Sequence, residues 1–310
     1  MRFFFFLALF LGLWCVELSA QSLPDLYSAA PKSLGSSQVL ASMPEKTFLE
    51  NLLFWNGGLY ATNHYTGEIL KLSDNGLMPF ASIKGVVTAL ASFDDKYMYA
   101  NGSNANKESV VWRISQAGNV EEFLKLEGVA FPNGMITIGK AGLLVADSYG
   151  SKIIKIDIQS KKQYVWLANS LLARSTPDAY FPGVNGIKIH SNFLYFTNTE
   201  KKIIGRVSIN KGEASGQPEL VAENQNWDDF CILSDGTLIG TTHVYNNLIM
   251  IKPNDQPVIV AGPEEGMVGS TAVITDKKSE KVLYITTNGG MSYPPASGLE
   301  KSKIVKIILQ

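Results

Sequence analysis

The sequence predicts an all-β protein with the fold of a six-bladed β-propeller. Short apolar segments that end in a polar residue recur about every 40 to 50 residues, which is the length of one four-stranded propeller blade. These segments are LYATN at Asn63, YMYAN at Asn101, LLVAD at Asp147, LYFTN at Asn198, LIGTT at Thr242 and LYITT at Thr287. Alternating apolar segments lie on both sides of each one, as at 69–72 and 153–156, which supplies the other strands of a blade.

The last blade is expected to be closed by a strand from the N-terminal region. Residues 304–309 form the last strand-like segment of the sixth unit, while 38–43 belong to no unit of their own. Pairing the two segments removes the open edge that a sheet must otherwise protect. A parallel β-helix is the main alternative, but its repeats are shorter and lack tight hairpins. No linker divides the chain, so 21–310 is predicted to be a single six-bladed domain.

The first 20 residues are typical of an export signal. Arg2 precedes the apolar run 3–16, and the small residues Ser19 and Ala20 precede the expected cleavage point. The run is shorter than the ~20 apolar residues of a transmembrane helix, so an uncleaved anchor is the weaker alternative. We expect a secreted or periplasmic protein with no membrane contact after cleavage. Cys231 would then be the only cysteine of the mature chain, which excludes an intramolecular disulfide.

The charge balance excludes some classes of partner. The chain carries 27 basic and 28 acidic residues, a formal net charge of −1, and so lacks the basic surface of a nucleic-acid-binding protein. No amphipathic helix or long open edge predicts a subunit interface. The expected partner is a small-molecule substrate, bound by a monomer.

Four polar residues lie at or near the starts of predicted innermost strands, at blade-like spacing. They are Glu50, Asn133, Asn185 and Asp228. In an antiparallel blade, the start of the innermost strand and the end of the next strand lie at the same end of the sheet. The four side chains are therefore expected to converge on the axis, with His64 and His243 at the same rim. The alternative is that these residues only stabilise turns.

Two carboxylates and two amides without a cysteine favour a hard cation. Ca²⁺ takes six to eight oxygen ligands and tolerates irregular geometry. Zn²⁺ is less favoured, because the chain has only three histidines and His190 is expected at the opposite face. The predicted cofactor is Ca²⁺ or another divalent metal.

Several motifs together resemble one known family. They are FLENLLFWNGGLYATN, FPNGMITIGKAGLLVADSYGSKIIKID, PGVNGIKIHSNFLYFTNT, WDDFCILSDGTLIGTTH and VLYITTNGG, spanning 48–290. The chain resembles the six-bladed propeller family of senescence marker protein, gluconolactonase and luciferin-regenerating enzyme, especially its exported members. This resemblance implies that Glu50, Asn185 and Asp228 bind a divalent metal, with Asn133 as a fourth ligand or a substrate contact. The family often places an arginine over sugar lactones, and no equivalent is evident here.

The chemistry expected of such a site is hydrolysis of a lactone or other ester. The ion would polarise the carbonyl group, and a carboxylate would accept a proton from the attacking water. Asp228 is the candidate base and Asn133 would orient the substrate, with His243 as a second candidate base. Asp147 is expected to be structural, capping the turn that follows it.

Two other functions remain open on the sequence alone. The metal could be structural, in a non-hydrolytic cyclase of the hetero-Diels–Alder type whose mouth holds a flat apolar substrate, or in a ligand-binding propeller without chemistry. The segment 171–182 is an insertion that could form a lid or a wall of the pocket. The aromatic residues expected near the mouth, which could instead pack between blades, are Tyr65, Phe131, Tyr149, Tyr180, Phe181, Tyr245 and Tyr293. The sequon at Asn101 is a possible glycosylation site.

Overall fold

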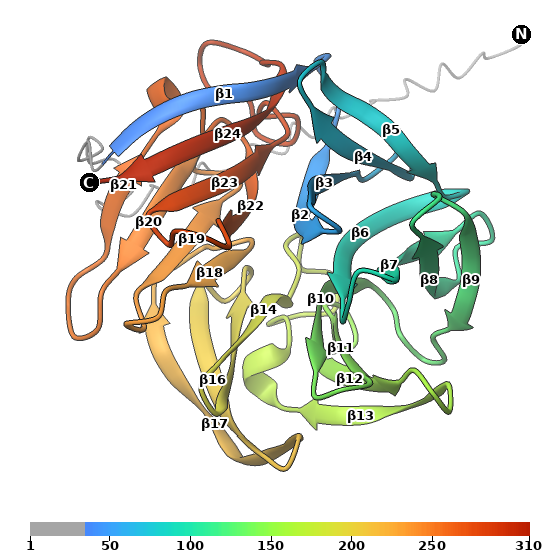
Figure 1. Ribbon diagram of the computed structural model, residues 1–310. Helices are drawn as coiled ribbons and strands as arrows, with labels where there is room; N and C mark the ends of the chain where they lie inside the picture. The colour runs from blue at the N-terminus through green and yellow to red at the C-terminus, as the bar shows by residue number, and fades with distance from the viewer. Residues whose placement is uncertain (1–34) are drawn as a thin grey trace, which may run out of the picture.

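The computed structural model describes residues 35–310, and it is a six-bladed β-propeller (Figure 1). Six four-stranded antiparallel sheets stand in a ring, as the sequence predicts. Within 35–310, no helix is long and apolar enough to cross a membrane. The predicted signal peptide, residues 1–20, lies outside the described residues.

In blades one to five the strands follow one another in chain order from the axis outward, and blade six takes its outermost strand from the N-terminal region. Blade one comprises β2(Leu49–Trp55), β3(Gly58–Asn63), β4(Glu68–Ser73) and β5(Gly76–Ser82). Blade two comprises β6(Gly85–Ser92), β7(Tyr97–Asn104), β8(Ser109–Ser115) and β9(Val120–Lys125). Blade three comprises β10(Pro132–Ile138), β11(Gly142–Asp147), β12(Lys152–Asp157) and β13(Lys162–Ala168).

The remaining blades continue the same pattern around the ring. Blade four comprises β14(Val184–His190), β15(Phe193–Asn198), β16(Ile203–Asn210) and β17(Glu213–Glu223). Blade five comprises β18(Phe230–Ile232), β19(Leu238–Thr242), β20(Asn247–Ile251) and β21(Val258–Ala261). Blade six comprises β22(Ser270–Thr275), β23(Val282–Thr287), β24(Ser302–Leu309) and β1(Gly35–Met43). The short 3-10 helices η1(Ser170–Leu172) and η2(Pro263–Glu265) lie in connections.

The ring is closed by the N-terminal strand, as predicted. β1 pairs antiparallel with β24, from Gly35 opposite Leu309 to Met43 opposite Ser302. In Figure 1 the blue β1 therefore lies beside the red β24, at the outer edge of blade six. This pairing joins the two ends of the described chain and leaves β24 with a partner on both sides.

The core lies between neighbouring blades. Six clusters of buried apolar side chains fill the six junctions, and each draws on the strands of two adjacent blades. At the first junction, for example, Trp55 and Ile69 of blade one pack with Met98 and Trp112 of blade two. Apolar faces on both sides of a sheet require this arrangement, because each blade is covered only when it has two neighbours.

A β-bulge near the start of the innermost strand directs a polar side chain toward the axis in blades one to four. In blade one, Glu50 and Asn51 together lie opposite Thr62, because the pairing passes from Leu49–Asn63 to Leu52–Ala61. Equivalent register shifts occur at Asn133, at Asn185 and at Thr88 of blade two. Such a bulge adds one residue to one strand and re-aims a side chain locally. The polar residues near the strand starts thus depart from the regular alternation of side chains between the two faces of a strand.

Threonine hydroxyls join successive bulges around the ring. The Thr197 hydroxyl accepts from the Gly186 N–H (2.9 Å) and donates to the Asp228 carbonyl of the next blade (3.1 Å). Thr62 and Thr241 make the same pair of bonds in their blades. Buried peptide groups that are satisfied in this way hold the axial backbone in one geometry.

Asn101 takes the corresponding position in blade two. Its side chain accepts from the Ala89 N–H (2.9 Å) and donates to the Asn133 carbonyl (2.7 Å). The side chain is completely buried, so the sequon at Asn101 is not accessible for glycosylation in the folded protein.

Candidate functional site

The four predicted ligand residues come together at one end of the axis. Glu50, Asn133, Asn185 and Asp228 all line a cavity of about 310 Å³ that opens at the mouth of the propeller. The same four residues also border a smaller cavity of about 20 Å³ further along the axis, together with Thr88 and Thr271. They therefore form a polar floor between the two spaces, as the blade geometry requires.

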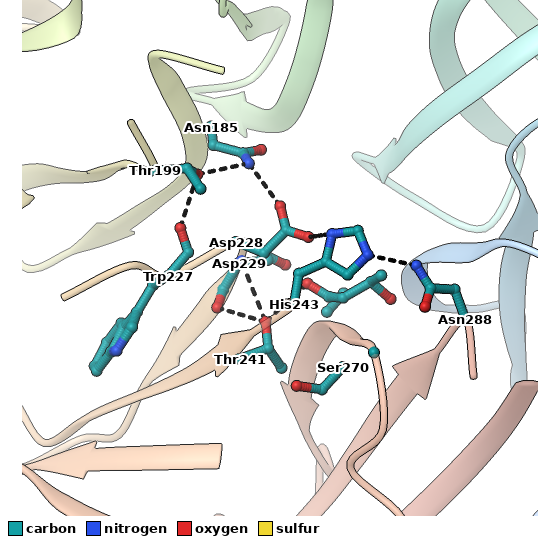
Figure 2. Close-up of polar contacts among 12 residues, drawn as sticks. Asn185, Thr199, Trp227, Asp228, Asp229, Thr241, His243, Ser270 and Asn288 are labelled. Carbon is teal, nitrogen blue, oxygen red and sulfur yellow. Dashed lines mark hydrogen bonds and ion pairs between the residues drawn. The ribbon is translucent and has the colours of Figure 1, made fainter. Parts of the chain in front are cut away.

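A short hydrogen bond joins two of these residues across blades four and five. The Asn185 Nδ2 donates to Asp228 Oδ1 (2.6 Å) and to the Thr199 hydroxyl (3.0 Å). Thr199 in turn donates to the Trp227 carbonyl (2.9 Å), which fixes its hydroxyl (Figure 2). Since both amide protons are used, the Asn185 Oδ1 is left as an acceptor.

Glu50 carries the clearest sign of an unsatisfied charge. Its Oε2 is buried and has no hydrogen-bond partner within the described structure. Burial, with the nearby Asp228 and Asp229 carboxylates as further causes, holds the pKa of Glu50 well above its ordinary value. A buried carboxylate of this kind is costly unless a cation or proton accompanies it.

Asp228 shares this electrostatic environment. Burial, with the adjacent Asp229 carboxylate as a second cause, raises the pKa of Asp228 to about 7, although the hydrogen bond from Asn185 opposes the shift. Asp229 itself forms an ion pair with Lys188. The Lys188 ammonium group therefore already has a carboxylate partner other than Glu50 and Asp228. No lysine or arginine lines the mouth cavity within the described residues. Ionised Glu50 and Asp228 would therefore leave two negative charges uncompensated.

This donor set fits a hard divalent cation. Among residues 35–310, no three His, Cys, Asp or Glu side chains lie close enough to bind a metal ion alone, so an ion at this floor would also need amide oxygens as ligands. Ca²⁺ accepts amide carbonyls beside carboxylates. The orphaned Oε2 of Glu50 and the open Oδ1 of Asn185 are oxygen atoms of the required kind.

His243 lies beside Asp228 and is held by Asn288. The Asn288 Oδ1 accepts from the Gly290 and Met291 N–H groups, so its Nδ2 must donate to His243 Nε2. The proton of the neutral ring is therefore on Nδ1, which lies 3.4 Å from Asp228 Oδ2 (Figure 2). Burial, and secondarily His64, lowers the pKa of His243 to about 4. Both ring nitrogens thus have a polar partner in the resting structure. His243 could act as a base only if one of these contacts broke.

His64 is fixed in a different way. It lines the mouth cavity, and its Nδ1 lies 2.9 Å from the Val87 carbonyl. Because a carbonyl only accepts, Nδ1 carries the proton and Nε2 is left as an acceptor. Burial lowers the pKa of His64 to about 4, so the ring is neutral near pH 7.

Sequence reasoning missed Thr199 and Asn288, although a signal was present. Both residues directly follow the end of a second strand, at the position that His64 and His243 occupy in their blades. A search one residue beyond the strand ends would have found them. Of the predicted strand-end residues, Asp147 caps its turn by accepting from the Gly150 N–H, as predicted.

Aromatic side chains surround the mouth. Six of the seven expected residues line the cavity, and Phe48 joins them. Tyr245 does not line it and packs against the apolar cluster between blades four and five. His190, at the far end of β14, lies away from the site, as expected.

The buried acids predict how pH affects stability. Native Glu50 and Asp228 keep protons that the unfolded chain has already lost, so unfolding releases protons and stability falls as pH rises. The lowered pKa values of His64 and His243 act in the opposite direction, but only below their ordinary value of 6.5. In chelator, the melting temperature should therefore fall between pH 6.5 and about 8, and excess Ca²⁺ should remove this fall. A melting temperature that rises over this range would contradict the placement of the two acids.

Comparison with known proteins supports the fold and gives one partial sequence match. No known family profile matches the chain. A segment of 129 residues is 31% identical to a candidate hetero-Diels–Alderase of Sarocladium schorii, covering 34% of this chain and 31% of that protein. The chain thus matches under a third of the length of this curated relative.

Solved structures of the same shape are distant in sequence. A gluconolactonase of Xanthomonas campestris has a TM-score of 0.62 at 12% identity, covering 88% of this chain and 89% of its own. A luciferin-regenerating enzyme gives 0.67 at 12% identity, with 88% and 95% covered. Virginiamycin B lyase of Staphylococcus aureus gives 0.62 at 16% identity, with 89% and 99% covered. The resemblance seen in the sequence is confirmed as a shared six-bladed fold.

Proposed function

We propose that the protein is a calcium-dependent or other divalent-metal-dependent hydrolase that cleaves a lactone or other ester in the mouth cavity. The observation that carries this proposal is the buried carboxylate pair, Glu50 and Asp228, which faces two amide side chains and has no cation of its own. The similarity in fold to a gluconolactonase supports it. If residues 1–20 act as a signal peptide, the enzyme works outside the cytoplasm as a secreted or periplasmic monomer.

Each residue of the polar floor has its own role in the proposed hydrolysis. Glu50, Asn185 and Asp228 hold the ion, which when bound polarises the ester carbonyl and stabilises the oxyanion. Asn133, on the same floor, orients the substrate. Asp228 accepts a proton from water as the water oxygen bonds to the carbonyl carbon. The carbon–oxygen bond of the ester then breaks, and the released alkoxide takes up the proton.

His243 supports the base in this scheme. Its Nδ1–H faces Asp228 Oδ2 and favours the ionised carboxylate, while Asn288 keeps the ring in this tautomer. His243 could serve as the base itself only if the contact with Asp228 or Asn288 opened.

A non-hydrolytic cyclase with a structural metal is the second candidate. The partial match to a candidate hetero-Diels–Alderase and the aromatic mouth favour it. In that case the polar floor would hold the ion and bind one end of an apolar substrate, and no water would be consumed.

Initial rates on a mixed panel of lactones and aryl esters test the proposal. Turnover should appear with Ca²⁺, disappear after chelation and return when Ca²⁺ is restored. If no ester is turned over while Ca²⁺ still raises the melting temperature, the hydrolase proposal fails and the cyclase or a ligand-binding propeller takes its place.

A further inference from the structure

Two loops from separate blades meet over the mouth of the cavity. Tyr180 and Phe181 belong to the connection between β13 and β14, whereas Tyr293 belongs to the loop between β23 and β24. Phe181 stacks on Tyr293 with ring centroids 5.9 Å apart and an interplanar angle of 30°. Tyr180 meets Tyr293 edge to face at 6.1 Å. These three rings, here called the aromatic roof, connect loops that are far apart in the sequence.

A second pair of rings lines the same cavity. Phe131 and Tyr149 stack at 4.9 Å with an interplanar angle of 28°. The Arg174 guanidinium lies 4.1 Å from the centre of the Tyr149 ring and donates to the Ala179 carbonyl, which connects this pair to the loop that carries Tyr180. The predicted role of 171–182 as a wall of the pocket agrees with these contacts.

The cavity is polar at its floor and aromatic at its mouth. Carboxylates and amides form the floor, while the aromatic roof and the pair Phe131–Tyr149 lie among the other lining residues. Tyr180 is 73% exposed and Tyr65 is 56% exposed, so a ligand could still cover much of their surface. Burial of such apolar area is favourable.

The charges at the site restrict the ligand further. Two acidic side chains line the cavity and no lysine or arginine does, within the described residues. A phosphate, sulfate or carboxylate on the ligand body would find no cationic side chain there. An uncharged body is therefore favoured over an anionic one, and flat rings suit the faces and edges that aromatic side chains present.

We propose that the aromatic roof and the pair Phe131–Tyr149 bind the planar aromatic or conjugated body of an uncharged ligand. The polar end of the ligand then faces Glu50, Asn133, Asn185 and Asp228. Only one part of this inference rests on the proposed function, namely that the polar end of the ligand is an ester. Sugar lactones, which present hydroxyl groups to the walls, are poor ligands on this account.

Equilibrium binding of two matched lactones tests the proposal. γ-Phenyl-γ-butyrolactone and γ-cyclohexyl-γ-butyrolactone share the ester group and differ in the planarity of the ring. Calorimetric titration of the chelator-treated protein, in which hydrolysis is not expected, should show roughly fivefold to tenfold tighter binding of the phenyl compound. The double variant Phe181→Leu, Tyr293→Leu should lose this preference and keep its affinity for the cyclohexyl compound within about twofold.

A matched control completes the design. Phe193→Leu removes a partly buried ring at the far end of blade four and should leave the preference intact. Equal affinity of the wild-type protein for both lactones, or an unchanged ratio in the double variant, would overturn the inference. Because binding is measured without turnover, a phenyl preference in a protein that hydrolyses no ester would leave the inference standing while the hydrolase proposal fails. Ester hydrolysis by a protein that binds both lactones equally would overturn the inference and leave the hydrolase proposal standing.

Discussion

Replacing Asp228 by asparagine is expected to lower the rate of ester hydrolysis by roughly a thousandfold while the propeller stays folded. The substitution keeps the size of the side chain and removes its charge and its ability to accept a proton. Asp228 is positioned by Asn185 at 2.6 Å and faces His243 at 3.4 Å, so an amide in its place fills the same space. Initial rates with saturating Ca²⁺ measure the loss.

The control for this variant is Asp255→Asn, the same chemical change at an exposed position in the connection between β20 and β21. It should keep the wild-type rate. Circular dichroism and the melting temperature should show that both variants fold. If Asp228→Asn retained more than about a tenth of the wild-type rate, Asp228 would not be the base and the cyclase would gain support.

Glu50→Gln is expected to weaken calcium binding by roughly a hundredfold, since one of only two carboxylates in the donor set is lost. The same change should stabilise the chelated protein at about pH 8, because a buried carboxyl group with an unpartnered oxygen is replaced by a neutral amide. Calorimetric titration with Ca²⁺ and thermal melts in chelator measure the two effects.

These opposite signs distinguish a metal ligand from a purely structural residue. A structural Glu50 would lose stability on substitution in both conditions. Glu264→Gln, an exposed acidic position in η2, serves as the control and should change neither quantity. Unchanged calcium affinity in Glu50→Gln would remove Glu50 from the site.

Much of the fold could be predicted because its signals are local and repeated. Each blade carries its own strand pattern, so the six units and the closing role of β1 follow from counting strands. The floor residues Glu50, Asn133, Asn185 and Asp228 could be found for the same reason, since each lies at a fixed place in its repeat. These residues converge because the ring places the starts of the innermost strands around one axis.

The parts that sequence reasoning missed depend on contacts between distant segments. Asn288 directly follows the end of β23, as His243 follows the end of β19, but its hydrogen bond to His243 depends on the packing of blades five and six, which no local pattern indicates. The pairing of Lys188 with Asp229 joins blades four and five and is likewise not local. Tyr245 was expected at the mouth, but it packs against the apolar cluster between blades four and five.

The measurement that tests the central claim most directly is the fate of solvent oxygen. The calcium-loaded protein would be incubated in H₂¹⁸O with the best lactone of the panel, and the product analysed by mass spectrometry. Hydrolysis through water held at Asp228 predicts one ¹⁸O atom in the carboxylate of the hydroxy acid, and no product after chelation. A product that contains no solvent oxygen, or one that forms equally well in chelator, would contradict the metal-dependent hydrolase.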